Sequence, residues 1–207
     1  MAHGARPAEL LRSGHRWVQR LRRLLLMLAV LLGITPLLAY ADAKAGEKKA
    51  QLCFACHKPT NPYHLPALEG QNREYLYNQL KAFKEKRRAD LAMQTNTANL
   101  STRDMRDIAD YFASRKPERV SFPLDAAKAS LGKLKVQSLP CADCHRADFS
   151  GSKDIPRLAG NHPRYILAQI LAFAAGKREH PPEGVKAMRE LSEQDAEHLA
   201  EYFAQLH

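Results

Sequence analysis

Two copies of one short motif carry the chemistry that can be recognised in this chain. The sequence reads C-x-x-C-H over Cys53–His57 and again over Cys141–His145. Two thiols separated by two residues can add to the two vinyl groups of a haem, and the adjacent imidazole then lies beside the iron as its proximal ligand. The candidate residues are Cys53, Cys56 and His57 for one haem, and Cys141, Cys144 and His145 for the other.

The remaining uses of a C-x-x-C pattern fit this chain less well. Its four cysteines all belong to the two motifs, so none is left for a structural disulfide or a nucleophile. Zinc ribbons place paired motifs roughly 15–20 residues apart, whereas these two are far apart, and each would lack an obvious fourth zinc ligand. A thioredoxin-like dithiol needs a βαβ setting, and no strand pattern lies near either motif. The motifs therefore predict redox chemistry at two covalently bound haem c groups.

The N-terminal residues predict export. A basic cluster over residues 16–23 precedes an apolar run over residues 24–38, and the small-x-small pattern of a cleavage site follows at Ala39–Ala41. We expect a signal peptide over residues 1–41, cleaved after Ala41 or Ala43, and a periplasmic mature protein. The alternative is an uncleaved membrane anchor, for which the apolar run is short of the ~20 residues that a span needs.

The charge of the chain does not indicate a nucleic-acid protein. The formal net charge of the full sequence is +10, but arginines of the predicted leader contribute part of it. In the remainder, basic and acidic residues alternate along segments with helical periodicity, which is typical of solvated helix faces. About 165 residues remain after the leader, enough for one ordinary domain or two small ones.

An internal repeat favours two small domains over one larger domain. The residues that follow each C-x-x-C-H motif recur at identical intervals. In the first half they are Pro66, Gly70, Tyr75, Gln79, Phe83 and Arg88; in the second half they are Pro156, Gly160, Tyr165, Gln169, Phe173 and Arg178. We infer one small domain duplicated, with domain 1 over residues 42–116, a proline-containing linker over 117–125 and domain 2 over 126–207.

Helices must position these motifs. Helical segments over 43–52 and 126–136 lead into the two motifs, and apolar stripes at helical spacing cover 75–83 and 165–173. Each half ends in a further helix whose first turn is preceded by a serine, Ser101 or Ser192, which predicts an N-cap. The expected fold class is all-α, with two tandem small helical cytochrome c domains, each wrapped around one haem.

These motifs resemble the cytochrome c4 type of dihaem cytochrome, in which two class I cytochrome c domains lie in tandem. The resemblance covers the whole predicted mature chain, with departures at Lys58 and Arg146, where the family usually has glycine after the motif histidine. It implies electron transfer, with the carbonyl oxygens of Pro66 and Pro156 accepting a hydrogen bond from each proximal imidazole. It also implies that the two domains face each other about a pseudo-twofold axis.

The sequence offers one candidate for the sixth iron ligand in the first half and several in the second half. Met93 lies in a predicted polar loop over residues 90–99, between two helices, where the family places its ligand methionine. The second half does not align at this point, because the position equivalent to Met93 falls near Gly184. Met188 is the candidate there, and His180 is the competing ligand, with Pro181 and Pro182 in the same predicted loop. An open or otherwise occupied position is the third possibility.

The two haem motifs thus predict an electron carrier and no enzyme, and the resemblance implies that single electrons pass between a respiratory donor and a terminal oxidase or reductase. The expected partners are a redox protein donor and acceptor, a membrane-bound oxidase among them, and no nucleic acid. The alternative is a cytochrome subunit of a dehydrogenase or oxidase complex, for example in sulfur-compound oxidation, with one open haem. His64 and His162 are expected to be exposed loop residues with no role as ligands.

Overall fold

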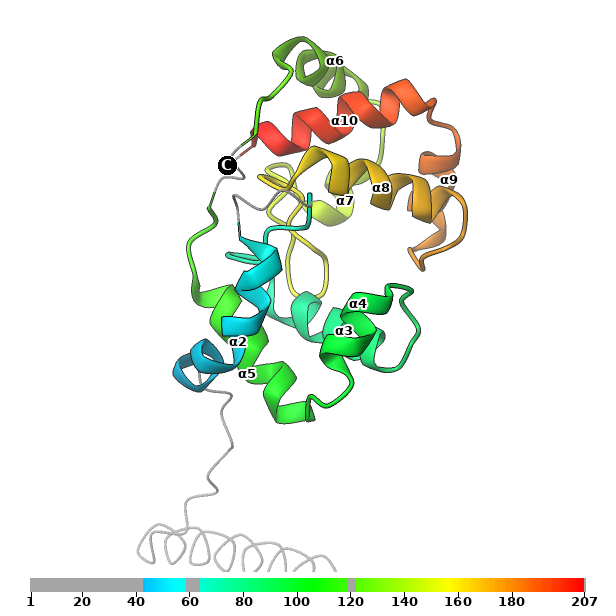
Figure 1. Ribbon diagram of the computed structural model, residues 1–207. Helices are drawn as coiled ribbons and strands as arrows, with labels where there is room; N and C mark the ends of the chain where they lie inside the picture. Colours follow the sequence, from blue (N-terminus) through cyan, green and yellow to red (C-terminus); the bar gives the residue numbers. More distant parts are fainter. Residues whose placement is uncertain (1–42, 59–63, 119–121, 207) are drawn as a thin grey trace, which may run out of the picture. The chain divides into compact units, whose positions relative to one another are not determined.

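The protein is helical throughout the part that its computed structural model describes, residues 43–58, 64–118 and 122–206 (Figure 1). The β structure within these ranges is an isolated bridge between Ser152 and Ile155, and turns and loops connect the helices. The predicted all-α class is confirmed. The helices are α2 (Ala43–His57), α3 (Arg73–Lys84), α4 (Leu91–Thr97), α5 (Thr102–Ser114), α6 (Ala126–Val136), α7 (Cys141–His145), α8 (Pro163–Ala174), α9 (Pro182–Arg189) and α10 (Glu193–Gln205).

The predicted signal peptide over residues 1–41 lies outside the described residues. None of the helices that are described is both long and apolar enough to cross a membrane.

In the first half, α2 packs against α5, and α3 packs against both α5 and α4. The α2–α5 contact needs a glycine, because a Cβ atom on Gly46 would lie 2.0 Å from the carbonyl oxygen of Asp107. Apolar side chains of these helices form one buried cluster, with Leu76, Ile108 and Phe112 among its members. The first motif lies at the C-terminal end of α2 and so directly beside this cluster.

The second half repeats this arrangement. Helix α6 packs against α10, α10 against α8, and α8 against α9. A Cβ atom on Gly132 would lie 2.0 Å from the carbonyl oxygen of His198 and 2.8 Å from Cβ of Tyr202. A second buried cluster, which includes Ile166, Leu199 and Phe203, fills the space between these helices. The equivalence of the two glycine crossings supports a duplicated domain.

The caps of the last helix in each half are confirmed. The Ser101 hydroxyl accepts from the backbone N–H of Asp104, and the Asp104 carboxylate accepts from that of Ser101, which makes a complete capping box. The Ser192 hydroxyl accepts from the N–H of Asp195 at 3.0 Å.

Two segments predicted as loops contain helices instead. The segment over residues 90–99 includes α4, because the Asp90 carboxylate accepts a hydrogen bond from the Met93 N–H and so caps a helix start. The segment after His180 includes α9, since Pro182 occupies the first helical turn, where a missing N–H costs no hydrogen bond.

Candidate haem-binding sites

The first C-x-x-C-H motif occupies the last turns of α2. Cys53 is partly buried, Cys56 is exposed, and His57 is only 8% exposed. The Nδ1–H of His57 donates to the carbonyl oxygen of Pro66 at 3.0 Å. This bond fixes the ring orientation and leaves Nε2 as the nitrogen able to bind a metal.

The second motif forms the short helix α7 and repeats the same contact. The Nδ1–H of His145 donates to the carbonyl oxygen of Pro156 at 2.9 Å. Cys141 is partly buried and packs against the second apolar cluster, while Cys144 is exposed. The structure therefore presents two thiols and one oriented imidazole at each motif, a donor set that fits covalent haem.

The electrostatics of the two imidazoles also suit metal binding. Burial lowers the pKa of His57, and the hydrogen bond to Pro66 only partly opposes this effect. Burial lowers the pKa of His145 as well. A lower pKa favours the neutral imidazole, which is the form that ligates a metal ion.

Met93 lies on α4, partly buried, one turn from the cap residue Asp90. The charges of Asp90 and Arg88 both act on the pKa of His57, so the segment that leads into α4 lies close to that ring. Met93 lies three residues beyond Asp90 in the sequence, and it stays the candidate sixth ligand there.

The two candidates in the second half are placed differently. Met188 lies on α9 and packs against the second apolar cluster, beside residues such as Leu191. The ring of His180 lies with its centroid 6.4 Å from that of His145 and 4.8 Å from that of Phe173. The structure thus brings His180 close to the proximal imidazole.

Hydrogen bonds join the two loops that hold the proximal imidazoles. The side chain of Gln71 accepts from the backbone N–H of Arg157 at 2.7 Å and donates to its carbonyl oxygen at 2.9 Å. In the reverse direction, Asn161 accepts from the backbone N–H of Ala67 at 3.1 Å. Ala67 and Arg157 directly follow Pro66 and Pro156 in the sequence, so the two loops contact each other reciprocally.

A second reciprocal set of contacts involves the repeat arginines. Arg88 donates through Nη2 to the hydroxyl of Tyr165 at 3.1 Å and to the side-chain oxygen of Gln169 at 3.2 Å. The equivalent contacts are those of Arg178 Nη2 with Tyr75 at 2.8 Å and Gln79 at 3.0 Å. The equal spacing of these residues in the two halves is visible in the sequence, but it does not by itself indicate that they contact each other across the repeat.

One prediction about histidines is wrong. His64 and His162 are both predicted to be exposed, but His64 is partly buried and His162 is only 4% exposed. His162 caps α8 and packs against the rings of His64 and Phe122. Its Nε2 lies 2.8 Å from Nδ1 of His64. The sequence places both histidines close to prolines, which favours exposed loops. It gives no sign that they pair, because they are 98 residues apart.

Comparison with known proteins gives a consistent result. Residues 131–207 match the cytochrome c family. The chain is 33% identical over 202 residues to cytochrome c4 of Pseudomonas aeruginosa, covering 90% of this chain and 100% of that protein. It is 30% identical over 162 residues to a thiosulfate dehydrogenase electron acceptor of Thiomonas intermedia, covering 71% of this chain and 74% of that one.

The fold agrees with a solved structure as well. The crystal structure of reduced recombinant cytochrome c4 from Pseudomonas stutzeri superposes with a TM-score of 0.72 at 32% sequence identity. The match covers 81% of this chain and 100% of the other.

Proposed function

Because this chain belongs to the cytochrome c4 family of dihaem cytochromes c, we propose that it carries single electrons in the periplasm between a respiratory donor and a terminal oxidase or reductase. It is an electron-transfer cytochrome, and its cofactor is covalently attached haem c. The observation that carries the proposal is the duplicated site, in which each C-x-x-C-H imidazole donates to a proline carbonyl.

The residues present fit the cofactor. Cys53 and Cys56 would hold one haem and Cys141 and Cys144 the other, through thioether bonds. His57 and His145 would each bind an iron through Nε2, and Met93 would complete the coordination of the first. Bound haem iron supplies a one-electron couple between its ferric and ferrous states.

The role of the polypeptide is to hold these ligands still and keep water away from them. The Pro66 and Pro156 carbonyls fix the two imidazole rings, which also sets how strongly each ring donates to a metal. The apolar clusters beside Cys53 and Cys141 give each site a low-polarity wall. Rigid ligands in such a pocket suit electron transfer, since little has to rearrange when the charge changes.

The contacts between the two halves support one carrier with two cooperating sites. Gln71 and Asn161 tie the loop of one proximal histidine to the loop of the other. The two imidazoles are therefore held in a fixed relation through hydrogen-bonded backbone.

A second candidate function is favoured by one relative. The electron acceptor of thiosulfate dehydrogenase from Thiomonas intermedia covers most of this chain at 30% identity. A protein of this kind receives its electrons from a sulfur-compound dehydrogenase, which would be a specific donor within the same carrier chemistry.

Stopped-flow spectroscopy of the purified haem-loaded protein tests the proposal. We expect the reduced protein to be reoxidised by oxygen only when membranes with a terminal oxidase are present, with one electron leaving each haem. Rapid oxidation by oxygen without membranes would contradict the carrier function. Thiosulfate added together with a thiosulfate dehydrogenase distinguishes the second candidate, because only that function predicts fast reduction by the pair.

A further inference from the structure

The repeat gives a register in which the second half has no methionine at the ligand position. Counted back from the caps Ser101 and Ser192, Met93 is equivalent to Gly184. Counted forward from the repeat arginines, Asp90 is equivalent to His180. The two counts differ by one, because the second half is one residue longer between the repeat arginine and the capping serine. Counted from the caps, the second half has Gly184 where the first half has Met93, and Pro181, the N-cap of α9, where the first half has Asp90, with His180 just before it.

The side chain of His180 fills the space that a residue at position 184 would use. A Cβ atom on Gly184 would lie 2.2 Å from Cε1 and 2.4 Å from Nδ1 of the His180 ring. Gly184 lies inside α9, although alanine is intrinsically more favourable than glycine inside any helix. The close approach of the His180 ring explains the glycine, so the histidine takes the place of a side chain at the position equivalent to Met93.

The geometry of the two imidazoles suits a shared metal ion. The ring centroids of His145 and His180 are 6.4 Å apart, and the ring planes differ by 24°. Two metal–imidazole bonds of about 2 Å each, together with the radii of two rings, span a distance of about this size. Nδ1 of His145 donates to Pro156, and Nδ1 of His180 lies 3.2 Å from the carbonyl oxygen of Pro181, which leaves Nε2 on both rings.

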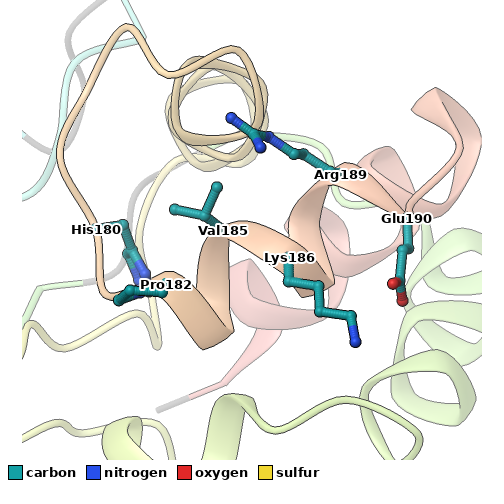
Figure 2. A pocket seen from close by; sticks show the side chains of 6 residues that line it. All are labelled: His180, Pro182, Val185, Lys186, Arg189 and Glu190. Carbon is teal, nitrogen blue, oxygen red and sulfur yellow. The ribbon is translucent and has the colours of Figure 1, made fainter.

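Met188 is placed for packing. It lies four residues beyond Gly184 on α9 and contacts the buried apolar cluster of the second half. A pocket of about 520 Å³ is lined by His180, by the α9 residues Pro182, Val185, Lys186 and Arg189, and by Glu190 at the end of that helix (Figure 2). His180 thus adjoins open space, while Met188 is partly buried and packs against the apolar cluster.

We propose that His180, together with His145, would bind the iron of the haem held by Cys141 and Cys144, and that Met188 is a packing residue. This inference rests on the proposed dihaem carrier. The two haems then differ, with His57 and Met93 on the first and His145 and His180 on the second. Because a methionine ligand raises the reduction potential, the second haem has the lower potential, and electrons settle on the first.

Near-infrared magnetic circular dichroism of the oxidised, full-length, haem-loaded protein tests this ligand set, because it distinguishes His/Met from His/His ligation in low-spin ferric haem. We expect one band of each kind in equal amounts. Two His/Met bands would overturn the proposal, as would a high-spin second haem in the unmodified protein.

Three variants make the assignment residue-specific. His180→Ala should lose the His/His band and give one high-spin haem, and added imidazole should restore the low-spin state. His180→Met should convert the His/His band into a second His/Met band and raise the lower of the two reduction potentials. Met188→Leu, which keeps an apolar side chain of similar volume, should leave both bands unchanged; loss of a band in this variant would overturn the proposal.

The same wild-type sample separates this inference from the proposed function. Two His/Met bands in a protein that membranes reoxidise would refute the role of His180 and leave the carrier intact. One His/His band in a protein that membranes do not reoxidise would support the ligand and refute the carrier. If His180→Ala does not accumulate, the wild-type spectrum and His180→Met still decide the question.

Discussion

The Nδ1 atoms of the two proximal histidines connect each candidate site to the rest of the fold. His57 and His145 both donate through this atom to a proline carbonyl, at 3.0 and 2.9 Å. Proline has no N–H to offer in return, so the carbonyl is the only backbone group that these two residues present to the ring. The tautomer with Nε2 available for a metal is the one that these bonds stabilise.

The equivalence of the two motifs leads to a first prediction. Replacing Cys53 and Cys56 together by alanine should remove about half of the haem absorbance, because each thiol pair serves its own haem. The matched variant with Cys141→Ala and Cys144→Ala should lose the other half. The pyridine haemochrome assay measures the haem content of each purified variant, and loss of both haems from either one would argue against independent loading.

A second prediction concerns pH and the pair His64–His162. Burial, together with the neighbouring charges of His64 and Arg164, lowers the pKa of His162 to about 4. Its Nδ1 accepts from the backbone N–H of Arg164, so protonation of that atom would also break the cap of α8. Between about pH 6.5 and 4 the unfolded chain binds this proton and the folded chain does not, so the free energy of unfolding should fall as the pH is lowered, by up to roughly 3 kcal/mol.

Denaturant titrations of the wild type and of His162→Asn at several pH values measure this effect. Asparagine is also a good N-cap residue, so the variant keeps the cap while removing the titrating ring. We expect the pH dependence over this range to be shallower in the variant. Parallel curves for the two proteins would show that His162 does not contribute.

At the scale of elements, glycines at helix crossings decide how closely the helices of each half approach. Gly46 lets α2 approach α5, and Gly132 lets α6 approach α10. In an isolated helix, alanine is favoured over glycine by about 1 kcal/mol. At these two positions, packing reverses that preference, because the added methyl group would overlap a backbone carbonyl of the partner helix.

The sign of the change in unfolding free energy in Gly132→Ala tests whether packing outweighs helix propensity at this position. Overpacking against the His198 carbonyl should lower the free energy of unfolding by roughly 2 kcal/mol in spite of the better helix propensity. Ser130→Ala, on the exposed side of the same helix, should change it by less than about 0.5 kcal/mol. Chemical denaturation measures both, and a more stable Gly132→Ala protein would mean that the helices do not approach as closely as described.

At the scale of the whole molecule, the repeat arginines join one half to the other. Arg178 donates to Tyr75 and Arg88 donates to Tyr165, and each guanidinium also lies over a phenylalanine ring of its own half at 4.5 Å for Arg88 and 4.6 Å for Arg178. This reciprocity is typical of a twofold interface, here within one chain. A charged donor bonded to a partly buried hydroxyl should contribute measurably to the association of the two halves.

A double-mutant cycle measures that contribution. Arg178→Met and Tyr75→Phe should together cost less than the sum of the single substitutions, by a coupling energy of about 1–2 kcal/mol in unfolding free energy. Arg87 provides the control, because it is exposed and pairs with Glu85 instead of Tyr75. The effects of Arg87→Met and Tyr75→Phe on the unfolding free energy should add within about 0.5 kcal/mol. Additivity of the first pair would show that this contact does not couple the halves.

Much of this protein could be predicted from local sequence patterns. The C-x-x-C-H motifs identify the cofactor, and the equal spacing from Pro66 and Pro156 reveals the duplication. Helix α6 has the predicted bounds, and both serine caps are found where they were expected. These features depend on residues a few positions apart, so the chain encodes them without reference to the rest of the fold.

The tertiary structure decided the features that depend on distant residues. It buried His162 against His64, placed Gly132 at a helix crossing, and brought His180 to the ring of His145. In the second half, Met188 is the candidate ligand by residue type alone, because counting along the chain places Gly184 at the position of Met93. Helix α9 begins at Pro182, two residues after His180, and its Met188 is partly buried against the apolar cluster. Which side chain comes close to the ring of His145 is therefore set by packing between elements rather than by residue type or spacing.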